Sequence, residues 1–517
     1  MRDRVLYPVQ IIALLSLAAF LSGCPAPWTV DNIAIPSQNG IPPFEPGYGA
    51  TPGPRAFAIS SAAGAHPVCI HKQEFRTNAA GNPCWVEIGM DYWPQGNTSG
   101  SYAYTTVVSP QAAPNSYSLD AICGLSADFG PNGLEVGCAY WMSEGGVTGP
   151  PEPGDWDFRS IHYGFLTNVG SSSFGAADVL SSARQVGGRF LCGPGTVLNQ
   201  WVSCMDFKYT KDGEKYWAIA ANRMVDGPGL CACPPNWNSP SEDAYTVWVY
   251  GPGIPAEGRA IDLDTPTYTA GDVEYSKGTI LDLHVAIKED QYGHFSRLCI
   301  LYSRNAPWFS QTTYPPTVFY KEIMSDGTVD PDTSASFPSP GAEPIWNCSL
   351  LMNNGCPMIA FSNNSPAVDD NNHVYFAQAV QNGNGYTWPA SPQDLTTVNV
   401  AGASNSVKTL GGRGARLGGM SVNPGDGQIA VSIQVKGVRD WLGDRMTTYV
   451  FRKNAAANNT TWSTYGVAQY ATDNADEVRP LIVAASAGTP GTRSTEYVLC
   501  RHATSWILPD YGVAHSQ

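Results

Sequence analysis

The sequence predicts an all-β protein, on the basis of its strand-like segments, its turn residues and the absence of a helical pattern. Short segments such as VWVY, HVYFAQAV and QIAVSIQV are rich in β-branched and aromatic residues and are bounded by Gly, Pro, Asn or Asp. No long segment repeats apolar residues at the i, i+3, i+4 and i+7 spacing of a helix. Charged residues make up only 14% of the chain, while 53 Gly and 41 Pro provide turns for many short strands.

The N-terminus predicts export and a lipid anchor. Arg2 and Arg4 precede an apolar run, Val9 to Leu21, which is followed by the motif Leu-Ser-Gly-Cys ending at Cys24. This motif resembles the lipobox of bacterial lipoproteins, in which the cysteine is lipidated and becomes the first residue of the mature chain. The resemblance implies a signal peptide over residues 1–23 and a membrane-anchored protein of the cell envelope, at the outer membrane or cell surface. The alternative is an ordinary signal peptide in which Cys24 has no role.

The segment after Cys24 predicts a tether. Residues 24–60 are rich in Pro and Gly and show no periodicity, so we expect an extended, semi-rigid linker. The globular domain is then expected over residues 61–517 as a single unit.

The cysteine count favours disulfide bonds. Of 13 cysteines, removing Cys24 leaves 12, an even number in a chain that we expect to be exported. Close spacing on strand-like segments suggests four local pairs, which are Cys69 with Cys84, Cys123 with Cys138, Cys192 with Cys204, and Cys348 with Cys356. The second pair is expected on a hairpin around residues 131–133, and the third pair on another hairpin between its two cysteines. A metal site is the alternative, but the C-x-C pair at 231–233 lacks the second pair of ligands that zinc requires.

Internal repeats specify the architecture. Residues 258–310, 357–391, 415–463 and 479–506 each contain a succession of strands and turns that ends near a Trp. Units of about fifty residues with four short strands are typical of β-propeller blades, and six or seven such blades fit the length. Tandem β-sandwiches are the alternative, because they also consist of many short strands.

Three of the turns resemble the Asp-box, or BNR repeat, of bacterial sialidase-like propellers. These are TKDGEKYW at 210–217, QNGNGYTW at 381–388 and the segment AANNTTW that ends at Trp462. In that family the motif S-x-D-x-G-x-T-W joins the third and fourth strands of a blade, and its residues are structural. The resemblance therefore implies a sialidase-like propeller and places the same residues in turns.

The same resemblance suggests where a ligand would bind. Sialidases hold the substrate carboxylate with three arginines, and a planar guanidinium grips a carboxylate with two hydrogen bonds. Here Arg259, Arg416 and Arg479 each precede a strand-like segment that we expect to be an innermost strand. The alternative is that they are peripheral arginines paired with nearby acids. The Arg-Ile-Pro motif of sialidases is absent, and no nucleophile or acid can be assigned, so the catalytic residues stay unknown.

Charge and composition limit the possible functions. A net charge of −15 without a basic stripe argues against a nucleic-acid partner. No motif calls for a cofactor; Ca²⁺ is conceivable at acidic turns, but none has the spacing of a calcium loop. His284, between apolar residues, is expected to be a packed histidine. Two functions stay open: a surface propeller that binds glycans, proteins or envelope components without catalysis, or a sialidase-like exo-glycosidase acting on acidic glycans.

Overall fold

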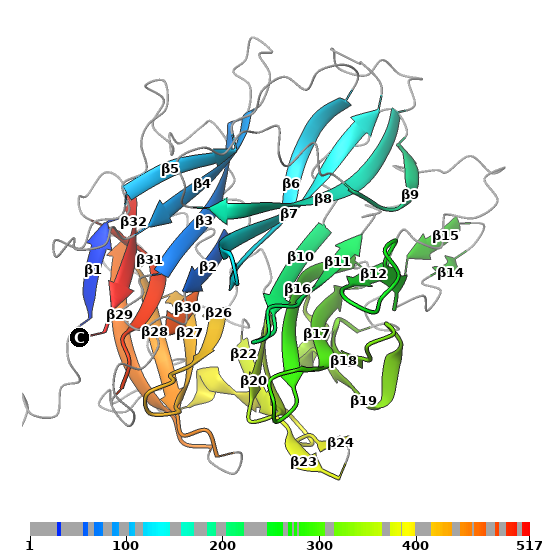
Figure 1. Ribbon diagram of the computed structural model, residues 1–517. Helices are drawn as coiled ribbons and strands as arrows, with labels where there is room; N and C mark the ends of the chain where they lie inside the picture. Colours follow the sequence, from blue (N-terminus) through cyan, green and yellow to red (C-terminus); the bar gives the residue numbers. More distant parts are fainter. Residues whose placement is uncertain are drawn as a thin grey trace, which may run out of the picture.

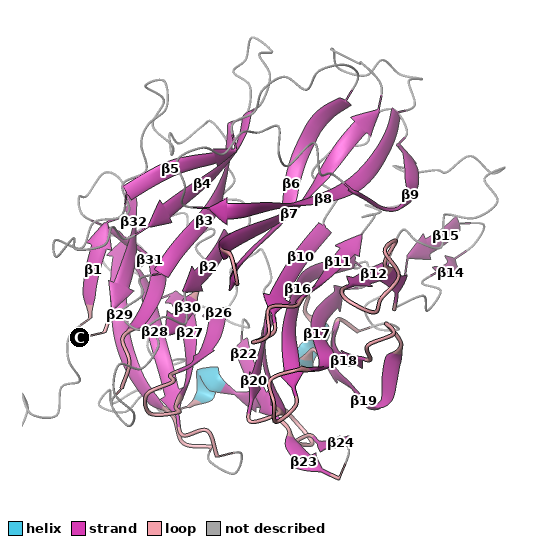
Figure 2. Ribbon diagram, in the orientation of Figure 1, coloured by secondary structure: helices cyan, strands magenta, loops and turns pink. Residues whose placement is uncertain are grey.

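The protein consists almost entirely of β-strands, with two short 3₁₀ helices, η5 (Pro340–Ala342) and η6 (Leu395–Thr397), among the residues that the structure describes (Figure 2). The structure is a computed structural model. The residues it describes are 28–32, 55–59, 67–75, 85–92, 103–108, 117–144, 157–169, 184–192, 203–221, 246–261, 267–270, 273–276, 279–305, 315–363, 373–383, 385–398, 415–436, 445–456, 460–471, 481–484, 493–503 and 509–516. None of the helices found there is long and apolar enough to cross a membrane.

The described strands form seven antiparallel four-stranded sheets, which are named here blades 1 to 7, from innermost to outermost strand. Blade 1 consists of β2 (Arg55–Ile59), β3 (Pro67–Phe75), β4 (Trp85–Tyr92) and β5 (Ala103–Val108). Blade 2 consists of β6 (Tyr117–Gly130), β7 (Gly133–Glu144), β8 (Asp157–Val169) and β9 (Arg184–Cys192). Blade 3 consists of β10 (Ser203–Tyr209), β11 (Lys215–Ala221), β12 (Thr246–Tyr250) and β13 (Arg259–Ala260).

Blade 4 consists of β16 (Thr279–Glu289), β17 (Phe295–Asn305), β18 (Thr317–Ile323) and β19 (Val329–Pro338). Blade 5 consists of β20 (Ile345–Asn353), β21 (Cys356–Asn363), β22 (His373–Gln378) and β25 (Gln393–Asp394). Blade 6 consists of β26 (Ala415–Val422), β27 (Ile429–Lys436), β28 (Arg445–Lys453) and β29 (Ser463–Ala471). Blade 7 consists of β30 (Ile482–Ala484), β31 (Glu496–Ala503), β32 (Pro509–His515) and β1 (Thr29–Asn32). Two small hairpins, β14 (Thr267–Ala270) with β15 (Val273–Ser276) and β23 (Val380–Asn382) with β24 (Gly385–Thr387), lie outside the blades.

The seven sheets follow one another around a common axis, so the fold is a seven-bladed β-propeller (Figure 1). The innermost strand of each blade contacts the innermost strand of the next, and β30 of blade 7 contacts β2 of blade 1, which closes the ring. A closed ring of four-stranded sheets confirms the predicted propeller and excludes tandem sandwiches, which would have two separate pairs of facing sheets.

The ring is closed by pairing the two ends of the chain. β1 forms the outermost strand of blade 7, and Thr29 pairs with His515 while Asn32 pairs with Gly512. The propeller therefore begins earlier than the predicted boundary at residue 61, because β1 and β2 both fall within the predicted tether of residues 24–60. The short strand TVDN carried little periodicity of its own, and its partner lies almost five hundred residues away in the sequence. The signal peptide and Cys24 lie outside the described residues.

Apolar side chains fill the spaces between neighbouring blades. One cluster joins blades 3 and 4 around Val247, Val249 and Ile300, and others join blades 4 with 5 and 5 with 6. Tyr302 and Phe361 are among the largest side chains that are fully buried. Burial of each such side chain contributes roughly 1.5–3 kcal/mol, so the blade contacts supply much of the stability of the ring.

A β-bulge lies near the start of the innermost strands of blades 4, 5 and 6. The bulges lie between Ile280 and Asp282, between Ile345 and Asn347, and between Leu417 and Gly419. In each case the residue after the bulge faces a serine of the second strand, namely Ser303, Ser362 and Ser432. The Asp282 N–H donates to Ser303 Oγ at 3.2 Å, and the Gly419 N–H donates to Ser432 Oγ at 3.1 Å. A bulge changes the direction of the next side chain, and in blade 4 it directs Asp282 toward blade 5.

The turns that resemble the Asp-box do not all occupy the same place. Trp388 and Trp462 follow the third strands of blades 5 and 6, as the resemblance implies, and Trp462 is 3% exposed against Phe376 and Phe451. The segment 210–217 instead joins the first and second strands of blade 3, so its predicted position is wrong. Its Thr210 accepts the N–H of Glu214 and donates to Asp212, which is how a tight hairpin turn is stabilised wherever it occurs.

The strand register corrects the Cys348–Cys356 pair. Both cysteines lie on the hairpin of β20 and β21, but Cys348 faces Phe361 whereas Cys356 faces Asn353 next to the turn. A disulfide needs two facing cysteines, and Cys356 carries a free thiol. Asn354 and Gly355, both with positive φ, form a tight two-residue turn between β20 and β21.

The structure describes only part of each of the other three predicted cysteine pairs or of the hairpin expected to carry it. Cys192 ends the outermost strand of blade 2 and Cys204 lies on the innermost strand of blade 3, so the hairpin predicted between them does not form. The hairpin predicted around residues 131–133 is confirmed, with Cys138 facing Leu125, while the side chain of Cys123 is outside the described part. Cys69 faces Asp91, and Cys84 lies outside the described residues. These three pairings stay predictions.

Candidate functional site

Polar side chains gather where the innermost strands of blades 2 to 5 face one another around the axis. Together they are called here the axial cluster. Its members are Ser126 and Asp128 on β6, Asp206 and Lys208 on β10, Asp282 and His284 on β16, and Cys348 on β20. Asp128 and Lys208 lie near the ends of their strands, and Asp282 and Cys348 near the starts of theirs. The cluster therefore crosses the inner wall of the ring obliquely.

Each carboxylate of the cluster joins its blade to the next one. Asp128 Oδ2 accepts the N–H of Tyr209 at 3.1 Å, and Asp206 Oδ2 accepts that of Val285 at 2.8 Å. Asp282 Oδ2 accepts the N–H of Cys348, also at 2.8 Å. An innermost strand has no partner strand on its axial edge, so backbone N–H groups there need side-chain acceptors. Three successive aspartates satisfy them in the same way.

Asp206 and Asp282 are occupied by further donors. Asp206 Oδ1 accepts from Ser126 Oγ at 2.5 Å and from the adjacent Phe207 N–H at 2.9 Å. Asp282 Oδ1 accepts the Leu283 N–H at 3.1 Å. A carboxylate that accepts several hydrogen bonds within the fold must break them before it can approach a reacting atom. These two groups therefore hold the ring together and are poorly suited to acid–base or nucleophilic chemistry.

Asp128, Lys208 and His284 are the more accessible members of the cluster. Their side chains are 24%, 38% and 24% exposed, against 11% for Asp206 and 13% for Asp282. Lys208 Nζ lies 4.0 Å from Asp128 Oδ1. Burial raises the pKa of Asp128, although Lys208 and the Tyr209 N–H oppose the shift. Burial lowers the pKa of Lys208, but Asp128 and Asp206 more than compensate, so the pKa of the amine ends above its ordinary value.

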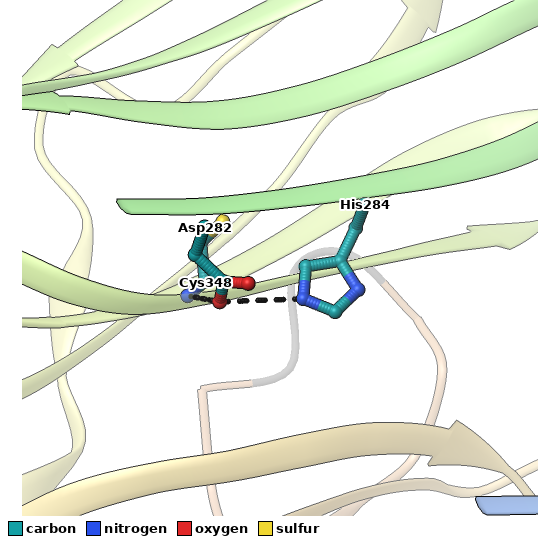
Figure 3. A group of neighbouring side chains, drawn as sticks. All are labelled: Asp282, His284 and Cys348. Carbon is teal, nitrogen blue, oxygen red and sulfur yellow. Dashed lines mark hydrogen bonds and ion pairs between the residues drawn. The ribbon is translucent and has the colours of Figure 1, made fainter. Parts of the chain in front are cut away.

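His284 lies between two carboxylates of neighbouring blades. Its Nε2 is 3.3 Å from Asp282 Oδ2 (Figure 3), and its Nδ1 is 3.8 Å from Asp206 Oδ2. Figure 3 shows the imidazole facing the Asp282 carboxylate, which also accepts the backbone N–H of Cys348. The sequence predicted a packed histidine between apolar residues. The structure instead places it, half-buried, within the polar wall of the axis.

The three predicted arginines do not occupy equivalent positions. Arg416 is the second residue of β26, an innermost strand, and is half-buried. Arg259 begins β13, which is the outermost strand of blade 3, so the prediction that it opens an innermost strand is wrong. There it is exposed and donates to the carbonyl oxygen of Asp326 at 3.1 Å. Arg479 lies outside the described residues.

The axial cluster has a signal in the sequence beyond the predicted arginines. The segments ADF, MDF and LDL place Asp128, Asp206 and Asp282 between apolar residues on three successive innermost strands. An aspartate flanked by apolar residues in a strand is unusual, because carboxylates are rarely buried without partners. Its recurrence on three successive innermost strands indicates a shared polar wall.

Searches with the sequence found no matching family model and no matching curated protein. Among solved structures the fold is similar to an α-L-arabinanase from Penicillium chrysogenum, with 9% identity, 95% of this chain and 97% of that chain covered, and a TM-score of 0.38. It is also similar to an ulvan lyase of polysaccharide lyase family PL25, with 10% identity, coverage of 91% and 94%, and a TM-score of 0.40. A mutant Trypanosoma rangeli sialidase gives 10% identity, coverage of 90% and 53%, and a TM-score of 0.34. Because these TM-scores are low, the fold assignment depends on the strand pairing described above.

Proposed function

We propose that this chain is an exported, lipid-anchored propeller of the cell envelope that binds a glycan at the axial cluster without cleaving it. The observation that carries the proposal is the accessible trio of Asp128, Lys208 and His284 among carboxylates that are fixed by backbone N–H groups. An acceptor, a cationic donor and an imidazole within one wall match the alternating donors and acceptors of sugar hydroxyls.

The charge of the cluster favours a neutral glycan. Asp128, Asp206 and Asp282 contribute carboxyl groups, whereas Lys208 is the one permanently basic member. A carboxylate-bearing sugar would meet more like than opposite charge there. The acidic ligand predicted from the arginines loses its main geometric support, because Arg259 and Arg416 lie on strands at opposite edges of their blades.

The fixed carboxylates favour binding over catalysis. A glycoside hydrolase uses two carboxyl groups, one as an acid and the other as a nucleophile or base. Asp206 and Asp282 are engaged by backbone and hydroxyl donors and cannot act in the second role without breaking contacts between blades. One observation supports the alternative of a glycosidase: burial raises the pKa of Asp128, as a general acid requires.

Glycan binding can be tested with Lys208→Met. We expect the wild-type chain to bind at least one neutral oligosaccharide of a glycan array without product formation, and Lys208→Met to bind it about 10- to 100-fold more weakly, the loss of one charged hydrogen bond. Lys211→Met is the matched control, because Lys211 is 81% exposed on the turn between β10 and β11. If both substitutions weaken the affinity for the oligosaccharide equally, or if neither weakens it, the ligand binds elsewhere.

The alternative has its own test. If the chain is a glycosidase, it will release sugar from the oligosaccharide that it binds, and Asp128→Asn will abolish release while the sugar still binds. Absence of release by the wild-type chain over the whole range of pH in which it is folded supports the binding function.

The anchor rests on the lipobox alone and is tested separately. We expect the wild-type protein to partition into the detergent phase and Cys24→Ser to partition into the aqueous phase, because several acyl chains are needed for stable anchoring. A Cys24→Ser variant that stays in the detergent phase would contradict lipidation at this residue.

A further inference from the structure

We propose that Asp282, His284 and Cys348 form a binding site for one divalent transition-metal ion, preferably Zn²⁺, between blades 4 and 5. The residues come from β16 and β20, neighbouring innermost strands, and one ligand atom of each lies within 4.8 Å of the others. Figure 3 shows the His284 imidazole facing the Asp282 carboxylate, with Cys348 beside Asp282. This site does not depend on glycan binding.

The spacing of the ligand atoms fits tetrahedral coordination. Bonds of about 2.0–2.1 Å from zinc to nitrogen and oxygen, at the tetrahedral angle, separate the two ligand atoms by about 3.3 Å. Asp282 Oδ2 and His284 Nε2 are 3.3 Å apart. The longer bond from zinc to sulfur, about 2.3 Å, places the cysteine slightly further from both, within the range that the structure allows.

The chemistry of the three ligands selects the metal. A thiolate and an imidazole suit zinc, copper or nickel, whereas calcium and magnesium require mostly oxygen ligands. Three protein ligands leave a fourth position open. Asp282 and His284 retain 13% and 24% of their side-chain surface, while Cys348 is fully buried, so the open position faces the accessible side of the cluster, where water or a ligand hydroxyl could coordinate.

Neighbouring groups already orient these ligands. The His284 ring turns its other nitrogen, Nδ1, toward Asp206 Oδ2 at 3.8 Å, in the manner of the carboxylate–histidine–metal arrangement. Asp206 is itself fixed by Val285 N–H and Ser126 Oγ. The Cys348 N–H holds the Asp282 carboxylate in place. A site whose ligands are fixed before the metal arrives loses less conformational entropy on binding.

The test is metal binding by the purified chain and by variants of the site. Zn²⁺ content by elemental analysis and affinity by calorimetry are measured for wild type, His284→Gln and Cys348→Ser, with His294→Gln and Cys356→Ser as controls. His294 lies on an exposed turn, and Cys356 is a free thiol on the same hairpin as Cys348. We expect one zinc per chain to be lost in both site variants and kept in both controls. We also expect Asp206→Asn to weaken affinity about 10- to 100-fold.

Cobalt gives a readout that does not require the site variants to fold. Co²⁺ bound to the wild-type chain should show a thiolate-to-metal charge-transfer band and tetrahedral d–d bands, and Cys356→Ser should show the same spectrum. Zinc content that is unchanged in folded His284→Gln and Cys348→Ser would overturn the proposal. So would a cobalt spectrum of the wild-type chain without a thiolate band.

Discussion

Two polar clusters join neighbouring blades, and they differ in how far water can reach them. At the junction of blades 6 and 7, Glu496 on β31 is 0% exposed and accepts from Arg452 Nε at 2.9 Å and from Arg493 Nη2 at 2.7 Å. The axial cluster of blades 2 to 5 also consists of charged groups between blades, but Lys208 there is 38% exposed.

The junction of blades 6 and 7, around Glu496, has more of its hydrogen-bonding groups paired than the axial cluster. Asn423 Nδ2 donates to Glu496 Oε1 at 3.2 Å, and the Glu496 N–H donates to Ser516 Oγ at 2.9 Å, near the end of the chain. These bonds tie blade 6 to the blade that contains both ends of the chain. Fully buried charges therefore secure closure of the ring, whereas charges that water reaches are available to a ligand.

Removing the buried carboxylate of Glu496 should have the largest effect on stability. Glu496→Gln leaves the buried guanidinium of Arg452, 6% exposed, without its counter-charge. Breaking a buried ion pair from one side costs about 3–5 kcal/mol in the free energy of unfolding, measured by urea denaturation. The pair of Lys211 with Glu289 provides the control: Lys211 is 81% exposed, so Lys211→Ala should cost about 0–1 kcal/mol. Similar losses in both variants would show that the junction has no special role in closure.

The axial carboxylates should matter less for stability. Asp206→Asn keeps the size of the side chain but turns an amide NH₂ toward one of the donors, Val285 N–H or Ser126 Oγ. We expect a loss of about 1–3 kcal/mol, because a buried donor is left without an acceptor. Urea denaturation that shows no change for Asp206→Asn would mean that the axial bonds between blades 3 and 4 contribute nothing to the ring.

The smallest effect is expected on the surface turn of blade 4. His294 Nδ1 lies 2.9 Å from Asp212 Oδ2, and this bond, with the charges of Asp290, Asp212 and Glu214, raises the pKa of His294. Because the folded-state pKa is raised, the stabilisation is fully present below 6.5, the ordinary value, and is lost as the pH rises through the raised one. The pKa of Asp212 is lowered, mainly by its hydrogen bond with His294 and next by the hydrogen bond from Thr210. The stability that the Asp212 carboxylate contributes is therefore lost only as the pH falls through that lowered pKa.

Thermal unfolding at several pH values tests this surface pair. We expect His294→Gln to lower the melting temperature slightly below pH 6.5 and to have no effect at alkaline pH. A difference between the variant and the wild type that grows with rising pH would contradict the assigned sign.

Much of the fold could be predicted from the sequence, because strand periodicity and turn residues are local signals. The repeat at 415–463 is an example: its three predicted strands are β26 to β28 of blade 6, and its turn, which ends at Trp462, precedes β29. The pairing of β1 with β32 could not be predicted, since four residues with little apolar pattern find a partner at the other end of the chain. Arg259 was misplaced for a related reason: a two-residue outermost strand has no periodicity from which its position can be inferred.

The candidate site was harder to predict than the fold. His284 was interpreted from its apolar neighbours along the strand, but its environment is set by Asp206 of the preceding blade and by the bulge that directs Asp282. Such groups are brought together only by the ring, so no spacing within one strand reveals them. The recurrence of an aspartate between apolar residues was the one local trace of the site.

We infer that the accessible axial cluster binds a ligand, whereas the buried charges at the junction of blades 6 and 7 secure the ring. The most direct measurement is the affinity of Lys208→Met and Glu496→Gln for the same oligosaccharide, without denaturant and at a temperature at which both variants are folded. The free energy of unfolding of each variant is measured in parallel. We predict that Lys208→Met loses affinity about 10- to 100-fold with less than about 1 kcal/mol lost in stability. Glu496→Gln should lose about 3–5 kcal/mol of stability with unchanged affinity. Loss of affinity in Glu496→Gln together with normal affinity in Lys208→Met would contradict this division of roles.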